Sequence, residues 1–140
     1  MSILVYVENI EGKFKKSAFE VVSYAKAIAN EQSTSVTALS IGNVADDELN
    51  KLAGFGASKI IKVEQEQLKQ FINKAYASVI AAAANSEQAN IIVLSNSFSG
   101  KGLAPRVAAK LEAGLADGAM ELPTFSGSDL HVKKTAFSNK

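Results

Sequence analysis

The chain has 140 residues, of which 47% are apolar and 21% charged, and its net charge is +1. This length predicts one domain with a substantial core, and the charge balance gives no electrostatic reason to expect nucleic acid or an anionic membrane as a partner. Cysteine is absent and histidine occurs once, at His131, which excludes disulfides, thiolate catalysis and metal sites built from cysteine or several histidines.

The first 114 residues predict strands and helices in strict alternation. Apolar β-forming runs predict strands at residues 3–7, 36–41, 60–63 and 91–94. A helix is predicted over residues 17–30, where Ser17 and Glu20 have capping-box spacing. A short helix follows, with Asp46, Asp47 and Glu48 at its positive end and Leu49, Leu52 and Ala53 buried, and Gly54 is expected to stop it.

Two further helices complete the alternation. Apolar side chains at helical spacing predict one helix from Leu68 to Ala83, and Gly114 is expected to close another. Such an order predicts a Rossmann-like parallel sheet with helices on both faces. The run Ile91-Ile92-Val93-Leu94 has no polar face and is therefore predicted to be a central strand.

After Gly114 the pattern changes. Residues 120–122 and 130–132 are short strand candidates, separated by a turn at residues 126–129. This spacing predicts a small antiparallel addition at the C-terminus. The N-terminus shows no targeting segment and no apolar run approaches the roughly 18 residues of a membrane span, so we expect a cytoplasmic protein.

The loop at residues 95–102 follows the predicted central strand, at the sheet edge where open α/β folds bind ligands. Its hydroxyl groups, its cations and the free amides before Pro105 could cradle an anion at a helix N-terminus. The candidate residues are Ser97, Ser99, Gly100, Lys101 and Arg106. A capped turn with two solvated cations explains the same residues, and the sequence leaves both interpretations open.

Other candidate motifs fail on their context. Residues 54–56, Gly-Phe-Gly, follow a helix and precede a strand, the reverse of a dinucleotide fingerprint, and are interpreted as a turn. Residues 100–102, Gly-Lys-Gly, lack the Ser or Thr of a phosphate-binding loop. His131 has no partner for acid–base work and is interpreted as a surface strand residue. The sequence thus contains no catalytic constellation.

Several segments nevertheless resemble a known family. They are ILVYVE at residues 3–8, TAL at 37–39, GFGASKI at 54–60, GLAPRVA at 102–108 and GLAD at 114–117. Together they resemble the N-terminal domain of the electron-transfer flavoprotein alpha subunit, over essentially the whole chain. The segment LAPRVA is the most specific of them.

The resemblance implies an alpha/beta heterodimer that carries FAD and passes electrons from dehydrogenases to a quinone reductase or another acceptor. It implies an adenine-nucleotide-hydrolase-like fold whose role is to scaffold the assembly and pack on the beta subunit, without catalytic residues of its own. FAD would be held mainly by a second, C-terminal alpha domain, and a structural AMP by the beta subunit. By this resemblance residues 1–140 are a single N-terminal alpha/beta domain without the family's C-terminal FAD-binding domain, so we expect no FAD in this chain alone.

Two departures from the family pattern stand out. Gly102 replaces the acidic residue that usually precedes Leu-Ala-Pro-Arg, and Lys133-Lys134 replaces the usual Arg-Pro. An alternative function is a small nucleotide-binding module of the universal-stress type, but its G-x-x-G-x(9)-G-[ST] signature is missing after the central strand. An independent hydrolase has no catalytic set to support it.

Overall fold

The computed structural model describes residues 2–65, 68, 72–95, 98–111, 114–116 and 131–135. The strands are β1 (Ser2–Val7), β2 (Asn9–Ile10), β3 (Lys13–Phe14), β4 (Val36–Ile41), β5 (Lys59–Val63), β6 (Ala89–Ser95), β7 (Gly114–Ala116) and β8 (His131–Thr135). The helices are α1 (Lys16–Gln32), α2 (Asp46–Ala53), α3 (Asn73–Ser86) and α4 (Phe98–Leu111). In this described part of the chain, no helix is both long and apolar enough to cross a membrane.

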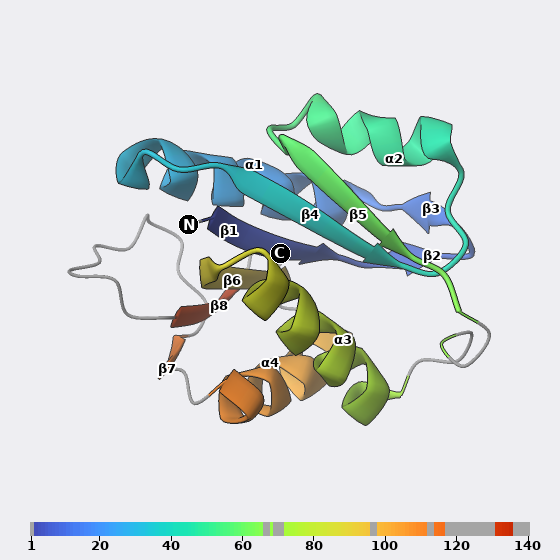
Figure 1. Cartoon of the computed structure of the whole chain (residues 1–140). Coiled ribbons are helices and arrows are strands. Elements are labelled where there is room, and N and C mark those ends of the chain that lie inside the picture. The colour runs from blue at the N-terminus through green and yellow to red at the C-terminus, as the bar shows by residue number, and fades with distance from the viewer. Residues whose placement is uncertain are drawn as a thin grey trace.

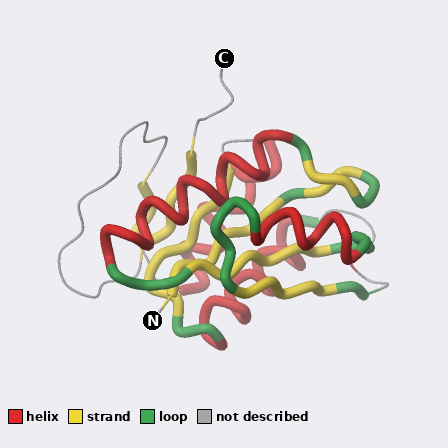
Figure 2. Tube along the Cα trace, turned by 90° about the horizontal axis from the view of Figure 1, so that it is seen from above, coloured by secondary structure: helices red, strands yellow, loops and turns green. Residues whose placement is uncertain are grey.

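A six-stranded sheet in the order β5-β4-β1-β6-β8-β7 forms the centre of the molecule. Each neighbouring pair in it is parallel. Helices α1 and α2 lie over one face, and α3 and α4 lie over the other (Figure 1). Figure 2 shows the strands side by side from above, with helices in front of and behind them. The predicted parallel sheet with two helical layers is confirmed.

The core consists of two apolar clusters, because successive residues of a strand point to opposite faces of the sheet. In β6, Ile91 and Val93 join the cluster beneath α1, whereas Ile92 and Leu94 join the cluster beneath α3 and α4. All four side chains are at most 1% exposed. The prediction that this run forms a strand covered on both faces is confirmed.

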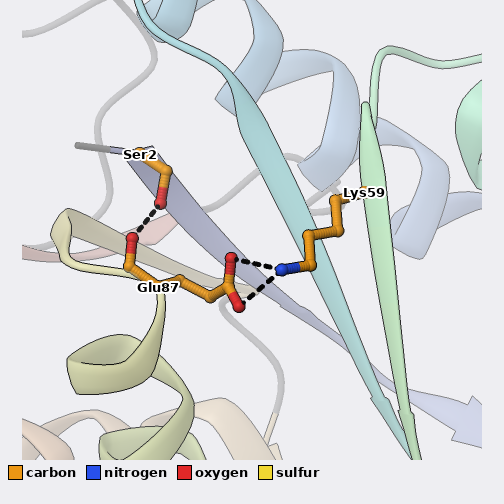
Figure 3. A network of polar contacts seen from close by, with 3 residues as sticks. All are labelled: Ser2, Lys59 and Glu87. Atoms are coloured by element: carbon orange, nitrogen blue, oxygen red, sulfur yellow. Dashed lines mark hydrogen bonds and ion pairs between the residues drawn. The ribbon is translucent and has the colours of Figure 1, made fainter.

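A polar network joins three segments at the amino ends of the strands (Figure 3). Glu87 lies in the turn between α3 and β6, and its backbone oxygen accepts a hydrogen bond from Ser2 Oγ at 3.0 Å. Its carboxylate receives Lys59 Nζ of β5 at 2.8 Å and 3.0 Å. The turn therefore connects β1 with β5, although β4 lies between these two strands in the sheet.

The predicted antiparallel addition at the C-terminus is wrong for the described residues. Strand β8 pairs parallel with β6, with Ile91 opposite His131, and β7 pairs parallel with β8. The candidate strand at residues 120–122 lies outside the described residues. Two short strands around a turn favour a hairpin on local grounds. In the structure β8 instead pairs with the free edge of β6, a strand that lies far from β8 in the sequence. Among the described residues, β2 and β3 form an antiparallel hairpin near the N-terminus.

The predicted capping box at Ser17 is also wrong. Helix α1 begins at Lys16, and its N-cap residue Lys15 has an extended backbone and makes no side-chain cap hydrogen bond. The buried Phe14 of β3 anchors the chain immediately before the helix. The hairpin therefore fixes where α1 starts, and Ser17 falls inside the first turn.

The next two helices need smaller corrections, to the buried residues of α2 and to the start of α3. Ala53 in α2 is exposed, whereas Ala57 beyond it is buried. The helix predicted from Leu68 begins at Asn73, leaving Leu68 buried outside it and Ile72 50% exposed. The Tyr76 hydroxyl donates to the Leu68 backbone oxygen at 2.8 Å. Leu68 is buried although it precedes α3, so the periodicity of the sequence alone could not show that Leu68 lies outside the helix.

Candidate functional site

The parallel strands β1, β4, β5 and β6 all end at one edge of the sheet, where ligands bind in open α/β folds. The sequence placed its candidate site after β6. The structure adds a pocket after β1, β4 and β5, with a volume of about 920 Å³. These two parts of the edge offer different chemistry.

The structure brings only some of the predicted anion-site residues together. Ser97 lies outside the described residues. Ser99, Gly100 and Lys101 lie in the first turn of α4, where backbone amides lack helical partners. Arg106 is exposed and lies beyond that turn. The anion site therefore stays a prediction, with Arg106 separated from the other three along the helix.

The loop predicted at residues 95–102 is shorter than expected, because α4 already begins at Phe98. Ser and Gly disfavour helix, and the sequence placed Pro105 near the helix start, where proline is tolerated. In the structure Pro105 lies inside α4. The helix is held by burial, since Leu103 and Val107 are fully buried against the cluster beneath α3 and α4. Tertiary packing thus overrides local propensity here.

Two tyrosines line the pocket after β1, β4 and β5, together with the apolar side chains of Ile10, Ile41 and Leu68. The rings of Tyr6 and Tyr76 meet edge to face, with centroids 6.4 Å apart. Tyr6 is only 4% exposed. Its burial, and next the Glu8 carboxylate, raise the pKa of the Tyr6 hydroxyl well above its ordinary value of 10.0. The hydroxyl is therefore neutral at physiological pH and can both donate and accept a hydrogen bond.

The loop after β1 is held in place by the side chain of Asn9. Its Nδ2 donates to the Ile41 backbone oxygen at 2.8 Å, and its Oδ1 accepts the Gly12 amide at 3.2 Å. The Gly42 amide in turn donates to the Val63 oxygen at 2.8 Å. These bonds join the ends of β1, β4 and β5, so they give the pocket a fixed wall.

The described residues around the pocket give it a negative charge. Glu8, Glu11 and Glu64 are among them, and neither lysine nor arginine is. The sequence predicts a strand that ends at residue 7 and gives Glu8 and Asn9 no functional role, so it does not predict this pocket. Their position directly after β1, at the carboxyl edge of a parallel sheet, was the available signal.

Glu48 has a structural role that its position in an acidic helix start did not reveal. Its Oε2 accepts the Phe14 amide at 2.8 Å, and its Oε1 receives Lys51 Nζ at 3.0 Å. The hydrogen bond from Phe14 and then that from Lys51 lower the pKa of the Glu48 carboxyl. The residue connects α2 to the hairpin of β2 and β3.

Two other motifs of the sequence lie in the described part of the chain. Residues 54–56 form a turn between α2 and β5, as expected, and not a dinucleotide loop. His131 lies at the start of β8, and its side chain is not described. Among the described residues, no group of three or more His, Cys, Asp or Glu side chains could hold a metal ion.

The fold and this edge define a class: a Rossmann-like α/β domain with a ligand-sized pocket after its first strands. The chain belongs to the electron transfer flavoprotein family, since the model of the electron transfer flavoprotein domain matches residues 3–140. This match confirms the resemblance to the N-terminal domain of the alpha subunit that the sequence showed.

Individual relatives are similar over most of this chain. The electron transfer flavoprotein subunit alpha of Megasphaera elsdenii is 32% identical over 113 residues, which cover 81% of this chain and 33% of that protein. The acryloyl-CoA reductase electron transfer subunit beta of Anaerotignum propionicum is 31% identical, covering 81% of this chain and 31% of that protein. The chain thus spans about a third of the length of relatives such as these.

Among solved structures, the universal stress protein from Archaeoglobus fulgidus has a TM-score of 0.55 and 15% identity, over 95% of this chain and 92% of that one. The same protein in complex with dAMP matches equally well, at a TM-score of 0.55. At this identity the likeness shows a shared fold and nothing about ligands. It confirms the expected adenine-nucleotide-hydrolase-like architecture.

Proposed function

We propose that this domain is the scaffold and subunit-interface unit of an electron-transfer flavoprotein, which carries electrons from dehydrogenases to a quinone reductase or another acceptor. The observation that supports this most is the family match over residues 3–140. Relatives named as electron transfer flavoprotein subunits support the same role. In this proposal the domain performs no catalytic step, and it packs on a beta subunit.

FAD belongs to the complete assembly in this proposal. The flavin would be held by a C-terminal alpha domain on another part of the protein, and the present domain would position that part against the beta subunit. The anion-site candidates Ser97, Ser99, Gly100, Lys101 and Arg106 receive no flavin role.

Co-expression tests the proposal directly. The chain purified alone should be colourless. Co-expressed with the flavin-binding domain of a family alpha chain and with the matching beta chain, it should copurify as a yellow complex with flavin absorbance. The two partners without this chain serve as the control. If they form the same flavin complex and never retain the chain, the proposal fails.

The alternative, a nucleotide-binding module of the universal-stress type, is favoured only by the shared fold. The acidic pocket argues against it, because phosphate groups would meet three glutamates there. Millimolar AMP should therefore leave the melting temperature nearly unchanged. A ligand at a hundredfold excess over its Kd would add about 2.7 kcal/mol of stability, and a shift of that size would favour the alternative.

A further inference from the structure

The face of α1 that points away from the sheet carries an apolar groove of about 610 Å³, beside the turn after α2. Phe55 of that turn lines it together with the α1 residues Phe19, Ser23, Tyr24 and Ala27. The rings of Phe19 and Phe55 stack with centroids 4.7 Å apart, and Phe55 is 44% exposed. Exposed apolar surface of this kind is typical of a protein–protein interface.

The charges at the two ends of α1 are placed against the helix dipole. The helix has no acidic residue in its first turn and no basic residue in its last turn. Instead, Lys16 lies at the positive amino end and Glu31 at the negative carboxyl end, and both residues are exposed. Each charge is therefore unfavourable where it stands, and each would be favourable at the opposite end of such a helix.

Both charges lie on the face of α1 that bears the groove, because residues 16, 20, 23, 27 and 31 recur at intervals of three or four along the helix. Glu20 follows Lys16 at a spacing that permits an ion pair. Neither Lys16 nor Glu31, however, belongs to an ion pair formed among the described residues. The two charges can thus meet charges of a second molecule.

An antiparallel copy of α1 matches both the groove and these charges. Lys16 is seven residues before Ser23 and Glu31 is eight residues after it. A two-fold axis at Ser23 therefore places Lys16 of each copy at the level of Glu31 of the other. It also brings the small Ala27 to the level of Phe19 of the second copy, so the same surface serves both copies, as in an isologous interface. A parallel copy would instead place Lys16 beside Lys16.

We propose that the groove on α1 is the interface between two copies of this chain, packed antiparallel about a two-fold axis at Ser23. Lys16 of one copy lies beside Glu31 and the negative helix end of the other, and the exposed rings of the groove are covered. This self-association is separate from the proposed flavoprotein role, because it requires only two copies of this chain.

Sedimentation of the chain alone, at concentrations up to about 1 mM, tests whether the dimer forms. A particle of twice the 14.8 kDa chain mass is expected. Its dissociation constant should rise as salt is added, because the pairs of Lys16 with Glu31 are exposed charges that salt screens.

Exchanging the two charges tests the antiparallel pairing. Lys16→Glu and Glu31→Lys should each weaken the dimer about tenfold, because both symmetric contacts become repulsive. The double variant should restore it. Each single change also favours the helix end that it occupies, so the melting temperature of the monomer should stay the same or rise while the dimer is lost.

Lys74→Glu is the matched control for Lys16→Glu. Lys74 is an exposed lysine in the first turn of α3, which lies on the other face of the sheet (Figure 1). The variant makes the same change of charge at the same position in a helix, and it should leave the dissociation constant of the dimer unchanged.

A single introduced cysteine tests the position of the axis. The chain contains no cysteine of its own, so a disulfide between two copies can form only at the introduced position. Under mild oxidation Ser23→Cys should form a linked dimer faster than Ser78→Cys, which places a cysteine at an exposed position on α3.

Three results would overturn the interface. These are a monomeric chain at about 1 mM, a dissociation constant that Lys16→Glu leaves unchanged, or linkage of Ser23→Cys no faster than that of Ser78→Cys. A monomeric chain whose flavin complex with a beta chain is weakened by Lys16→Glu would assign this face to the beta chain instead. Failure of the flavin complex together with an intact dimer would contradict only the proposed function.

Discussion

At the scale of single residues, Glu48 links stability to pH. Its folded-state pKa lies below the ordinary value of 4.5, first because it accepts the Phe14 amide and then because of Lys51. A carboxyl with a lowered folded pKa stabilises the protein fully above about pH 4.5 and loses that contribution as the pH falls through its folded pKa. We expect Glu48→Gln to lower the free energy of unfolding at pH 7 and to have less effect at pH 3.

Urea unfolding of both proteins at the two pH values measures this difference. Asp47→Asn is the control, because Asp47 is an exposed carboxylate in the same helical turn. An equal loss for Glu48→Gln at pH 7 and pH 3 would show that its charge is not involved.

The turn after α2 contains two glycines, of which one has a backbone conformation that other residues rarely adopt and the other does not. Gly56 has φ +125°, and an added Cβ would lie 2.6 Å from Lys26 Cβ on α1. Gly54 has helical φ −66°. We expect Gly56→Ala to cost about 1–3 kcal/mol of unfolding free energy through backbone strain and displacement of α1, whereas Gly54→Ala should be neutral or slightly stabilising. Urea unfolding compares the pair, and equal effects would refute this distinction.

At the scale of elements, Pro105 tests where α4 begins. Inside a helix, proline removes a hydrogen bond and costs up to about 3 kcal/mol relative to alanine. Because Pro105 is exposed and lies within α4, Pro105→Ala should raise the unfolding free energy by about 1–3 kcal/mol. Arg106→Ala, also exposed on α4, should stay within about 0.5 kcal/mol. No gain from Pro105→Ala would place the helix start later, as the sequence predicts.

At the scale of the whole molecule, the contact of Glu87 with Lys59 joins α3, β6 and β5 (Figure 3). The Lys59 side chain is 59% exposed, so its ion pair should contribute only about 0.2–1 kcal/mol. A double-mutant cycle of Lys59→Met and Glu87→Gln, measured by urea unfolding, should give a coupling of this size that shrinks in about 1 M salt. A coupling that salt leaves unchanged would show that the contact is packing and not charge.

The amino-acid sequence was sufficient to predict the order of the elements and the central place of residues 91–94. The side chains of four consecutive apolar strand residues can all be buried only if helices cover both faces of the sheet. Ile91 to Leu94 therefore indicate a strand covered on both faces without any tertiary information. Periodicity of two or 3.6 residues likewise distinguishes the strand segments from the helical ones. The family could also be recognised from short sequence segments such as residues 102–108.

The element boundaries, the pairing of β8 and the pocket became visible only in the folded chain. Ser17 has no capping role because β3 positions the start of α1, and Pro105 is held inside α4 by the burial of Leu103 and Val107. Strand β8 pairs with β6, and the pocket joins Glu8 to Glu64, residues distant in the chain. Local patterns record the preference of a segment, whereas these features depend on contacts between distant segments, which exist only after the chain has folded.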